Sequence, residues 1–159
     1  MTPYIVNKVS RKVNKVVGNR MDPYLTHSFF VEIDGITVAG FTDVSGLGAD
    51  TEVERKSFGG ENDREYSFIT RTKYSDITLK HGVTNQDYLW RWYESVINGR
   101  VYRRNGSIYI LDDSGKPAVW WDFYDACPIK WEGPAFNASG NSVAIETLVL
   151  THQGLYRHR

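Results

Sequence analysis

The last third of the chain, residues 120–155, most restricts what this sequence can fold into. Four aromatic residues within five positions predict a strand there: Trp120, Trp121, Phe123 and Tyr124. Pro128 and the pair at 133–134 are expected to interrupt the backbone, and residues 142–152 form a second strand-like run. This order of strand, turn and strand indicates packing and contact surfaces rather than chemistry on a small molecule.

The size of the chain predicts a single domain. With 159 residues it can bury enough apolar surface to fold without disulfides or a metal. Cys127 is the one cysteine, which excludes an intrachain disulfide and suits a reducing compartment. The N-terminus lacks the continuous apolar stretch of a secretory signal peptide, and no apolar run approaches the ~18 residues that span a bilayer. We therefore expect synthesis in the cytoplasm without a signal peptide and no integral membrane segment.

The formal net charge of zero hides an asymmetry between the N-terminus and the remainder. Residues 1–20 carry five basic and no acidic side chains, so the remaining residues have a net charge of −5. A mildly acidic body disfavours general nucleic-acid binding. Valines recur at helical spacing near the N-terminus, with lysines on the other face. We assign residues 1–21 to a basic N-terminal arm or docking helix, and 22–159 to the body domain.

The arm is expected to order only when it docks on a partner, because a valine-rich helix is weak in isolation. A frayed tail and a segment lying on a membrane surface are the alternatives. The docking residues expected from the pattern are Val6, Val9, Val13, Lys12 and Lys15.

Alternating polar and apolar residues in the body predict about seven strands, over 27–34, 36–44, 51–55, 75–81, 107–111, 118–126 and 142–152. Turns are expected at Asp34–Gly35 and at 112–115, and a long polar loop over 57–66. One helix is expected to start at Thr84 with Asp87 in a capping box, and to end at 98–99. Its expected buried residues are Leu89, Tyr93, Val96 and Ile97. The pattern predicts a mainly β (α+β) fold, a small antiparallel β-sandwich or barrel with one packed α-helix.

No arrangement of reactive residues indicates an enzyme. The four histidines are scattered and Cys127 stands alone, so no metal site is expected. The glycines at 46 and 48 lack the third glycine of a dinucleotide-binding loop, and Pro117 follows Gly115 and Lys116 where a phosphate loop needs serine or threonine. Glu52 and Glu54 share a strand face, which is more often a charged surface than an acid–base pair. We expect no catalytic, cofactor-binding or metal-binding residues.

Several short motifs, taken together in one order, resemble a known family. The matching stretches are 22–24, 30–35, 40–41, 44–47, 58–62, 78–84, 89–90, 98–99, 128–131, 133–134, 144–146 and 152–155. They are similar to the tail tube proteins of contractile phages and the inner tube proteins of extracellular contractile injection systems. This family is related in fold to the tube protein of type VI secretion. The resemblance covers about residues 22–155.

The resemblance implies a structural subunit that forms stacked hexameric rings around a lumen, inside a sheath that drives the tube through a target envelope. Implied partners are further copies of the chain, a sheath protein, baseplate or hub and cap proteins, and luminal cargo, either effector protein or DNA. The implied location is a phage tail or extracellular injection particle assembled from protein made in the bacterial cytoplasm.

The resemblance also implies two contact regions. One is an inter-ring stacking loop, with Phe58 as an anchor between flexible glycines and a charged strand, formed by Glu52, Glu54, Arg55, Phe58, Gly59, Gly60 and Asn62. The other is a helix on the tube exterior, where the sheath contacts are expected at Asp87, Arg91 and Glu94.

Two departures from the family pattern leave room for other functions. The arm is longer than expected, and Ser57–Phe58 stand where a tyrosine and an acidic residue are expected. A baseplate-proximal tube initiator or a terminal ring of the same apparatus is therefore one alternative. A monomeric, aromatic-rich β module that binds a carbohydrate or peptide is an alternative from another class.

Overall fold

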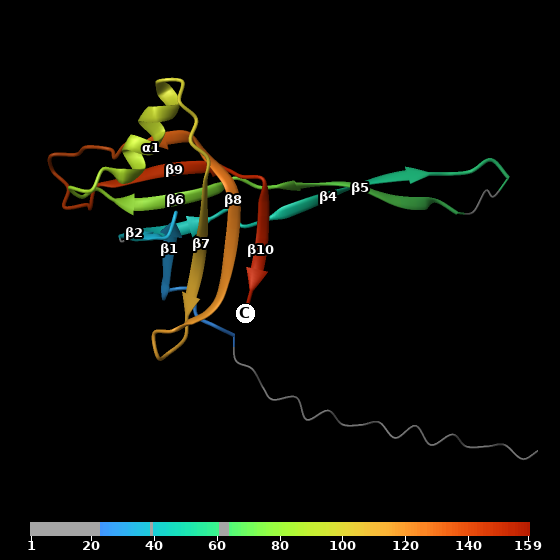
Figure 1. Ribbon diagram of the computed structural model, residues 1–159, viewed down its shortest axis with the longest axis horizontal. Coiled ribbons are helices and arrows are strands. Elements are labelled where there is room, and N and C mark those ends of the chain that lie inside the picture. Colours follow the sequence, from blue (N-terminus) through green and yellow to red (C-terminus); the bar gives the residue numbers. More distant parts are fainter. Residues whose placement is uncertain (1–22, 39, 61–63) are drawn as a thin grey trace, which may run out of the picture.

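The computed structural model describes residues 23–38, 40–60 and 64–159. These residues form ten strands and one helix (Figure 1). In chain order the elements are β1 (Phe29–Ile33), β2 (Ile36–Val38), β3 (Phe41–Ser45), β4 (Ala49–Lys56), β5 (Tyr66–Tyr74), β6 (Ile77–Gly82), α1 (Tyr88–Ile97), β7 (Arg104–Leu111), β8 (Pro117–Glu132), β9 (Ile145–Thr151) and β10 (Gly154–His158).

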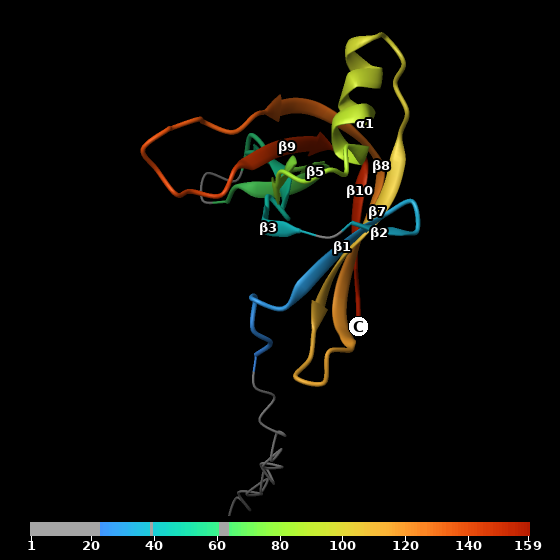
Figure 2. The same cartoon turned by 90° about the vertical axis from the view of Figure 1, so that its left-hand side faces the viewer.

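The strands of the body form one sheet that folds into two layers. The strand order is β2-β1-β7-β8-β9-β6-β3, and β10 also pairs with β8. The first part of β8 pairs with β7 and β10, whereas its last part, from Cys127 to Glu132, pairs with β9. Strands of the two layers run across each other (Figures 1 and 2). The single long strand β8 therefore belongs to both layers.

The core lies between these layers and beneath the helix. Alternate residues of the strands point inward because successive side chains of a strand face opposite sides. One layer contributes Val31, Ile33, Ile108 and Phe123, and the other contributes Ile77, Leu79, Leu148 and Leu150. Leu89 and Trp92 of α1 complete this cluster.

The helix is confirmed, but its start and its buried face differ from the prediction. Its N-cap is Asp87 rather than Thr84, and no side chain caps it. Trp92 is buried together with Leu89, whereas Ile97 is exposed. The Trp92 indole N–H donates to the Tyr102 carbonyl oxygen at 2.8 Å. Five residues of an α-helix turn by about 140° beyond one full turn, so a helix that buries Trp92 directs Ile97 away from the core.

The predicted fold class is confirmed, and three details of the strands are corrected. The expected return strand over 36–44 is two short strands, β2 and β3. Pro128 does not interrupt β8, because the β8–β9 register shifts between Pro128 and Lys130, and a bulge tolerates a residue that lacks an N–H group. Strands β5 and β10 were not expected at all.

A row of aromatic rings crosses the outer face of one layer. Phe30, Tyr109, Trp120 and His158 come from four neighbouring strands, and their ring centroids lie 4.4, 5.9 and 5.4 Å apart in that order. His158 also pairs through Nε2 with the Asp122 carboxylate at 2.8 Å. Stacked cross-strand pairs of this kind stabilise a sheet, so this row fastens the C-terminal strand β10 to the body.

Substitution of Gly46 tests whether the turn between β3 and β4 requires a glycine. Its φ is +88°, and a Cβ there would lie 2.0 Å from the Asp76 carbonyl oxygen. We expect Gly46→Ala to lower the free energy of unfolding, measured by urea denaturation, by about 3 kcal/mol or more. Gly115 is the matched control, because its φ is +78° but no atom lies within 4 Å. Gly115→Ala should cost only about 1–2 kcal/mol, and equal losses would contradict the proposed close approach.

Candidate assembly surface

Strands β4 and β5 form a hairpin that projects from the body. They make a two-stranded sheet separate from the main one, and Figure 1 shows them extending well beyond the other strands. The hairpin is attached at its base, where the Ser75 N–H donates to the Gly48 carbonyl oxygen at 3.0 Å. Close approach of Gly46 to Asp76 secures the same junction. The base is therefore anchored, whereas the tip has no strand partner outside the hairpin among the described residues.

A buried histidine joins the hairpin base to the C-terminal strand. The two ring nitrogens of His152 lie 2.9 Å from the Ser75 carbonyl oxygen and 3.0 Å from the Gly154 carbonyl oxygen. A neutral imidazole carries one N–H and can donate only one of these bonds, whereas the protonated ring donates both. His152 therefore has a structural position between the hairpin base and β10.

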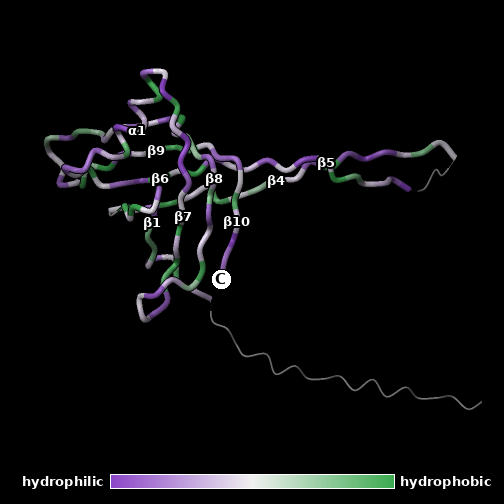
Figure 3. The backbone as a smooth tube through the Cα atoms, in the orientation of Figure 1, coloured by the Kyte–Doolittle hydropathy of each residue, from purple (hydrophilic) through white to green (hydrophobic). Residues whose placement is uncertain are grey.

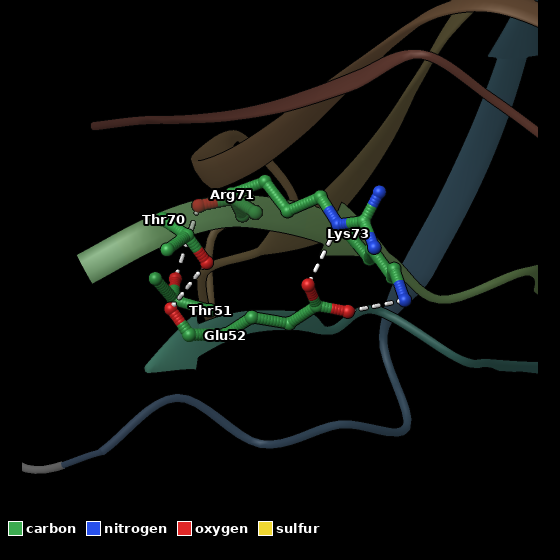
Figure 4. Close-up of polar contacts among 6 residues, drawn as sticks. Thr51, Glu52, Thr70, Arg71 and Lys73 are labelled. Carbon is green, nitrogen blue, oxygen red and sulfur yellow. Dashed lines mark hydrogen bonds and ion pairs between the residues drawn. The ribbon is translucent and has the colours of Figure 1, made fainter. Parts of the chain in front are cut away.

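A cluster of ion pairs fixes the register of the hairpin near its base (Figure 4). The Glu52 carboxylate accepts a hydrogen bond from Arg71 Nε at 2.6 Å, and its other oxygen pairs with Lys73 Nζ. A bulge lies here, because the β5 segment from Ile69 to Thr72 pairs with only Thr51 to Val53. Glu52 therefore lies opposite the β5 segment that contains the extra residue, and its ion pairs with Arg71 and Lys73 hold that segment in place.

The outer part of the hairpin exposes large apolar side chains. Ile69 is 78% exposed, although most residues of its type are buried in folded proteins. The ring of Phe58 packs edge-on against Tyr66, with centroids 5.7 Å apart. Figure 3 shows hydrophobic stretches along the hairpin between hydrophilic ones. The exposed set is Val53, Phe58, Tyr66, Phe68 and Ile69.

The structure places the residues of the predicted stacking loop on this hairpin. Glu52, Glu54 and Arg55 lie on β4, and Glu52 and Glu54 share a face, as expected from regular alternation of β4. Phe58 is exposed and is followed by the exposed turn glycines, Gly59 and Gly60. Asn62 lies outside the described residues, as do all the residues of the predicted arm.

Sequence reasoning missed the second strand of the hairpin. A loop was expected over 57–66 and no element between it and residue 75, but β5 covers Tyr66–Tyr74. The overlooked signal is a run from 66 to 74 of aromatic, β-branched and charged residues, a composition typical of strands. It contributes five residues to the candidate surface: Tyr66, Phe68, Ile69, Arg71 and Lys73.

The helix presents the polar surface that the sequence predicted. Asp87, Arg91 and Glu94 are all exposed. The Arg91 guanidinium pairs with the Asp87 carboxylate at 2.7 Å, an i, i+4 pair on the face opposite Leu89 and Trp92. This face of the helix is therefore charged and exposed in the isolated chain.

Three strands of the body have an edge that pairs with nothing else in the described parts of the chain. They are β2 and β3, at the two ends of the strand order, and β10, which pairs only with β8. Near β3 the two layers leave an open cavity of about 530 Å³, lined by Phe29, Val44, Leu47, Ile108 and Trp121 among others. Unpaired strand edges are templates for pairing with another chain, so the body carries contact surfaces besides the hairpin.

Within residues 23–38, 40–60 and 64–159, no three His, Cys, Asp or Glu side chains come together as metal ligands. The same residues contain no helix with the length and apolar character needed to cross a membrane.

The ion-pair cluster predicts a lowered pKa for the Glu52 carboxyl, which can be measured. Hydrogen bonds from Lys73, and then from Arg71, hold the pKa of the Glu52 carboxyl below its ordinary value of 4.5. Its contribution to hairpin stability is therefore complete above pH 4.5 and is lost as the pH falls through the lower folded-state value. In an NMR titration, Lys73→Gln should raise the Glu52 pKa more than Arg71→Gln does. Lys56→Gln, which removes the 3.2 Å partner of Glu54, is the control and should leave it unchanged. A wild-type Glu52 that titrates at or above its ordinary value would contradict the cluster.

Comparison with solved structures shows that the fold of this chain occurs in other proteins. A chain in the baseplate of the anti-feeding prophage is 27% identical, with a TM-score of 0.78 over 87% of this chain and 97% of that one. A chain in the PVC sheath–tube complex, an extracellular contractile injection system in its extended state, is 22% identical, with a TM-score of 0.78 over 86% and 91%. Hcp1 from Flavobacterium johnsoniae is more distant, at 15% identity and a TM-score of 0.52 over 81% and 93%. No curated protein matches the chain.

The family comparison confirms the resemblance seen in the sequence motifs. The family model of the T4-like virus tail tube protein gp19 matches residues 25–156, which is most of the chain. The matched residues include the projecting hairpin and the strands with open edges. The chain therefore belongs to the family of T4-like virus tail tube proteins, whose fold also occurs in contractile injection systems.

Proposed function

We propose that this protein is a structural subunit of the inner tube of a contractile tail or injection system, without catalytic activity. Copies would form hexameric rings that stack into a tube around a lumen. The observation that carries the proposal is the hairpin, which projects from the body and exposes five large apolar side chains. Such a surface is unfavourable in water and favourable when another subunit covers it.

Within a ring, the open edges of β2, β3 and β10 would pair with neighbouring subunits. Closing the sheet in a ring satisfies the free N–H and C=O groups of the edges. The lumen would admit cargo, either effector protein or DNA. The exposed face of α1 would lie outside the tube and contact the sheath through Asp87, Arg91 and Glu94.

Between rings, the hairpin would reach the next layer. Its contacts would be made by the charged strand and the tip, namely Glu52, Glu54, Arg55, Phe58, Gly59, Gly60 and Asn62, together with the apolar residues of β5. A head-to-tail contact of this kind does not close on itself, so its repetition along one axis builds a filament. Baseplate or hub and cap proteins would bind the two ends of that filament.

A specialised ring at one end of the tube is the second candidate. It is favoured by the 27% identity to a chain in the anti-feeding prophage baseplate and by the basic segment at residues 1–21. A main-tube subunit occupies every ring, whereas an initiator or terminal subunit occupies one. Ring-by-ring imaging of intact particles distinguishes the two by copy number. A monomeric β module that binds a carbohydrate or peptide would give no rings at all.

A pair of substitutions tests the stacking surface. Ile69 and Val143 are similarly exposed, at 78% and 75%, but only Ile69 lies on the hairpin. Removing a buried isoleucine side chain from a contact costs about 1.5–3 kcal/mol, a tenfold or greater loss of affinity. We therefore expect Ile69→Ser to shorten or abolish tubes in negative-stain micrographs while the thermal unfolding midpoint stays close to that of the wild type. Equal effects of Ile69→Ser and Val143→Ser would contradict a specific hairpin contact.

The N-terminal arm is proposed to dock only in the assembly, through Val6, Val9, Val13, Lys12 and Lys15. We expect amide hydrogen exchange over residues 1–21 to slow when the purified protein assembles, because docking excludes water from the backbone. Exchange over Ile77–Gly82, a central strand of the body, is the internal control and should stay slow in both states. Equal exchange of the arm in free and assembled protein would refute the docking.

A further inference from the structure

His152 is a buried histidine whose two ring nitrogens both face backbone carbonyl oxygens. The residue is 6% exposed. Its Nδ1 lies 3.0 Å from the Gly154 carbonyl oxygen, and its Nε2 lies 2.9 Å from the Ser75 carbonyl oxygen. A carbonyl oxygen only accepts hydrogen bonds, so each of these contacts needs an N–H on the ring. Because only the protonated imidazole carries two N–H groups, the geometry fits the charged form of the ring.

The surroundings of the ring offset part of the cost of burying that charge. Charged donors form stronger hydrogen bonds than neutral donors, which compensates for the removal of a charge from water. The Tyr74 ring at the end of β5 lies 5.5 Å from the imidazole, within the range in which an aromatic ring attracts a cation. The protonated ring therefore has three favourable contacts at this position.

The other titratable groups close to His152 along the chain or across the sheet come from three segments. Asp76 follows Ser75 in the turn before β6, and Tyr156 follows Gly154 on β10. Asp125 of β8 comes directly after Tyr124, whose carbonyl oxygen accepts a hydrogen bond from the Gln153 N–H at 2.9 Å. Among the described residues, ion pairs to carboxylates are made by His81 and His158 but not by His152. The direct effect of a proton on His152 therefore falls on its two carbonyl contacts.

These two contacts respond differently when the ring loses its proton. Gly154 is two residues from His152, and this short link keeps its carbonyl oxygen close to Nδ1. Ser75 belongs to a separate segment at the base of the hairpin, 77 positions away in sequence, and can move away. The remaining N–H should therefore stay on Nδ1, which leaves the bare Nε2 facing the Ser75 oxygen. Two acceptors cannot bond to each other, so loss of the proton weakens the attachment of the hairpin base.

We infer that His152 is a pH-sensitive latch, in which the protonated ring fastens the base of the β4–β5 hairpin at Ser75 to the start of β10 at Gly154. Histidine side chains ordinarily change charge between about pH 5 and 8. Since the contact to Ser75 requires the proton, the latch is closed at the acidic end of this range and opens as the pH rises. The latch is a property of the single subunit. An effect on tubes, whose assembly would be favoured at acidic pH, rests in addition on the proposed function.

Amide hydrogen exchange of Ser75 tests the latch, because the Ser75 N–H donates to the Gly48 carbonyl oxygen at the hairpin base. The full chain is compared at about pH 5.5 and about pH 8, with correction for the intrinsic dependence of exchange on pH. We expect the protection of Ser75 to be about tenfold lower at the higher pH, the effect of one lost hydrogen bond. Protection of β7 is the internal control and should not change. Equal protection of Ser75 at both pH values would overturn the inference.

Nitrogen NMR of the His152 ring measures the protonation directly. Both ring nitrogens should carry a proton at the lower pH, and only Nδ1 should carry one at the higher pH. A ring with the same number of protons at both pH values would contradict the latch, and so would a neutral ring protonated on Nε2. Both measurements concern contacts within one subunit, so they give an answer whether or not tubes form.

Two substitutions distinguish His152 from the other histidines. His152→Gln should abolish the pH response of Ser75, and a surviving response would refute the assignment. His158→Gln is the matched control, because His158 also holds β10, through Asp122 at 2.8 Å, but its side chain is 43% exposed. This variant should keep the response, and its loss would show that His158 is the sensor instead. Should His152→Gln fail to fold, the wild-type exchange and NMR measurements still decide the outcome.

Discussion

The backbone hydrogen bonds of β8 join the two layers of the body. This strand bonds to β7 and β10 along its first part and to β9 along its last. The change occurs near Asp125, a non-glycine residue with φ of +51°. Its N–H donates to Asn105 Oδ1 at 3.0 Å, and its carbonyl oxygen accepts from Arg103 at 2.9 Å. These bonds hold an unfavourable backbone conformation, and the bend lets one strand serve two layers.

Because β8 joins both layers around one core, the surfaces of the body that remain open are the strand edges and the projecting hairpin. The base of the hairpin is anchored at Gly46, Gly48 and His152. Among the described strands, β4 and β5 pair only with each other, and β2, β3 and β10 each have one edge that pairs with no other strand. Binding of a partner to the folded state stabilises that state by mass action. Assembly would therefore supply part of the stability that the isolated chain lacks, and this division suits a subunit of a repeating tube.

Much of the body could be predicted from local sequence. The turns at Asp34–Gly35 and 112–115 are visible as short polar and glycine-rich signals, and the strands next to them alternate cleanly. The helix was visible as a segment, but its buried face was not. Burial of Trp92 depends on the Tyr102 carbonyl oxygen, which only the folded chain brings near.

The candidate site was harder to predict, for a physical reason. Strand β5 is exposed at every residue except its last, Tyr74, so it lacks the one-sided apolar alternation by which strands are recognised. Its Phe68 and Ile69 are exposed on neighbouring positions of the strand, so no one-sided apolar pattern marks them in the sequence. Strand β10 follows β9 after two residues and resembles a tail in sequence. Pro128 was misread because the bulge that tolerates it depends on pairing with β9.

In the proposed tube, the open strand edges and the hairpin of one subunit are covered by other copies of the chain. Sedimentation velocity of the purified full chain over a wide concentration range tests this coverage. Species of six chains and of multiples of six should appear and should grow with concentration. A single species with the 18.2 kDa mass of one chain at every concentration would contradict it.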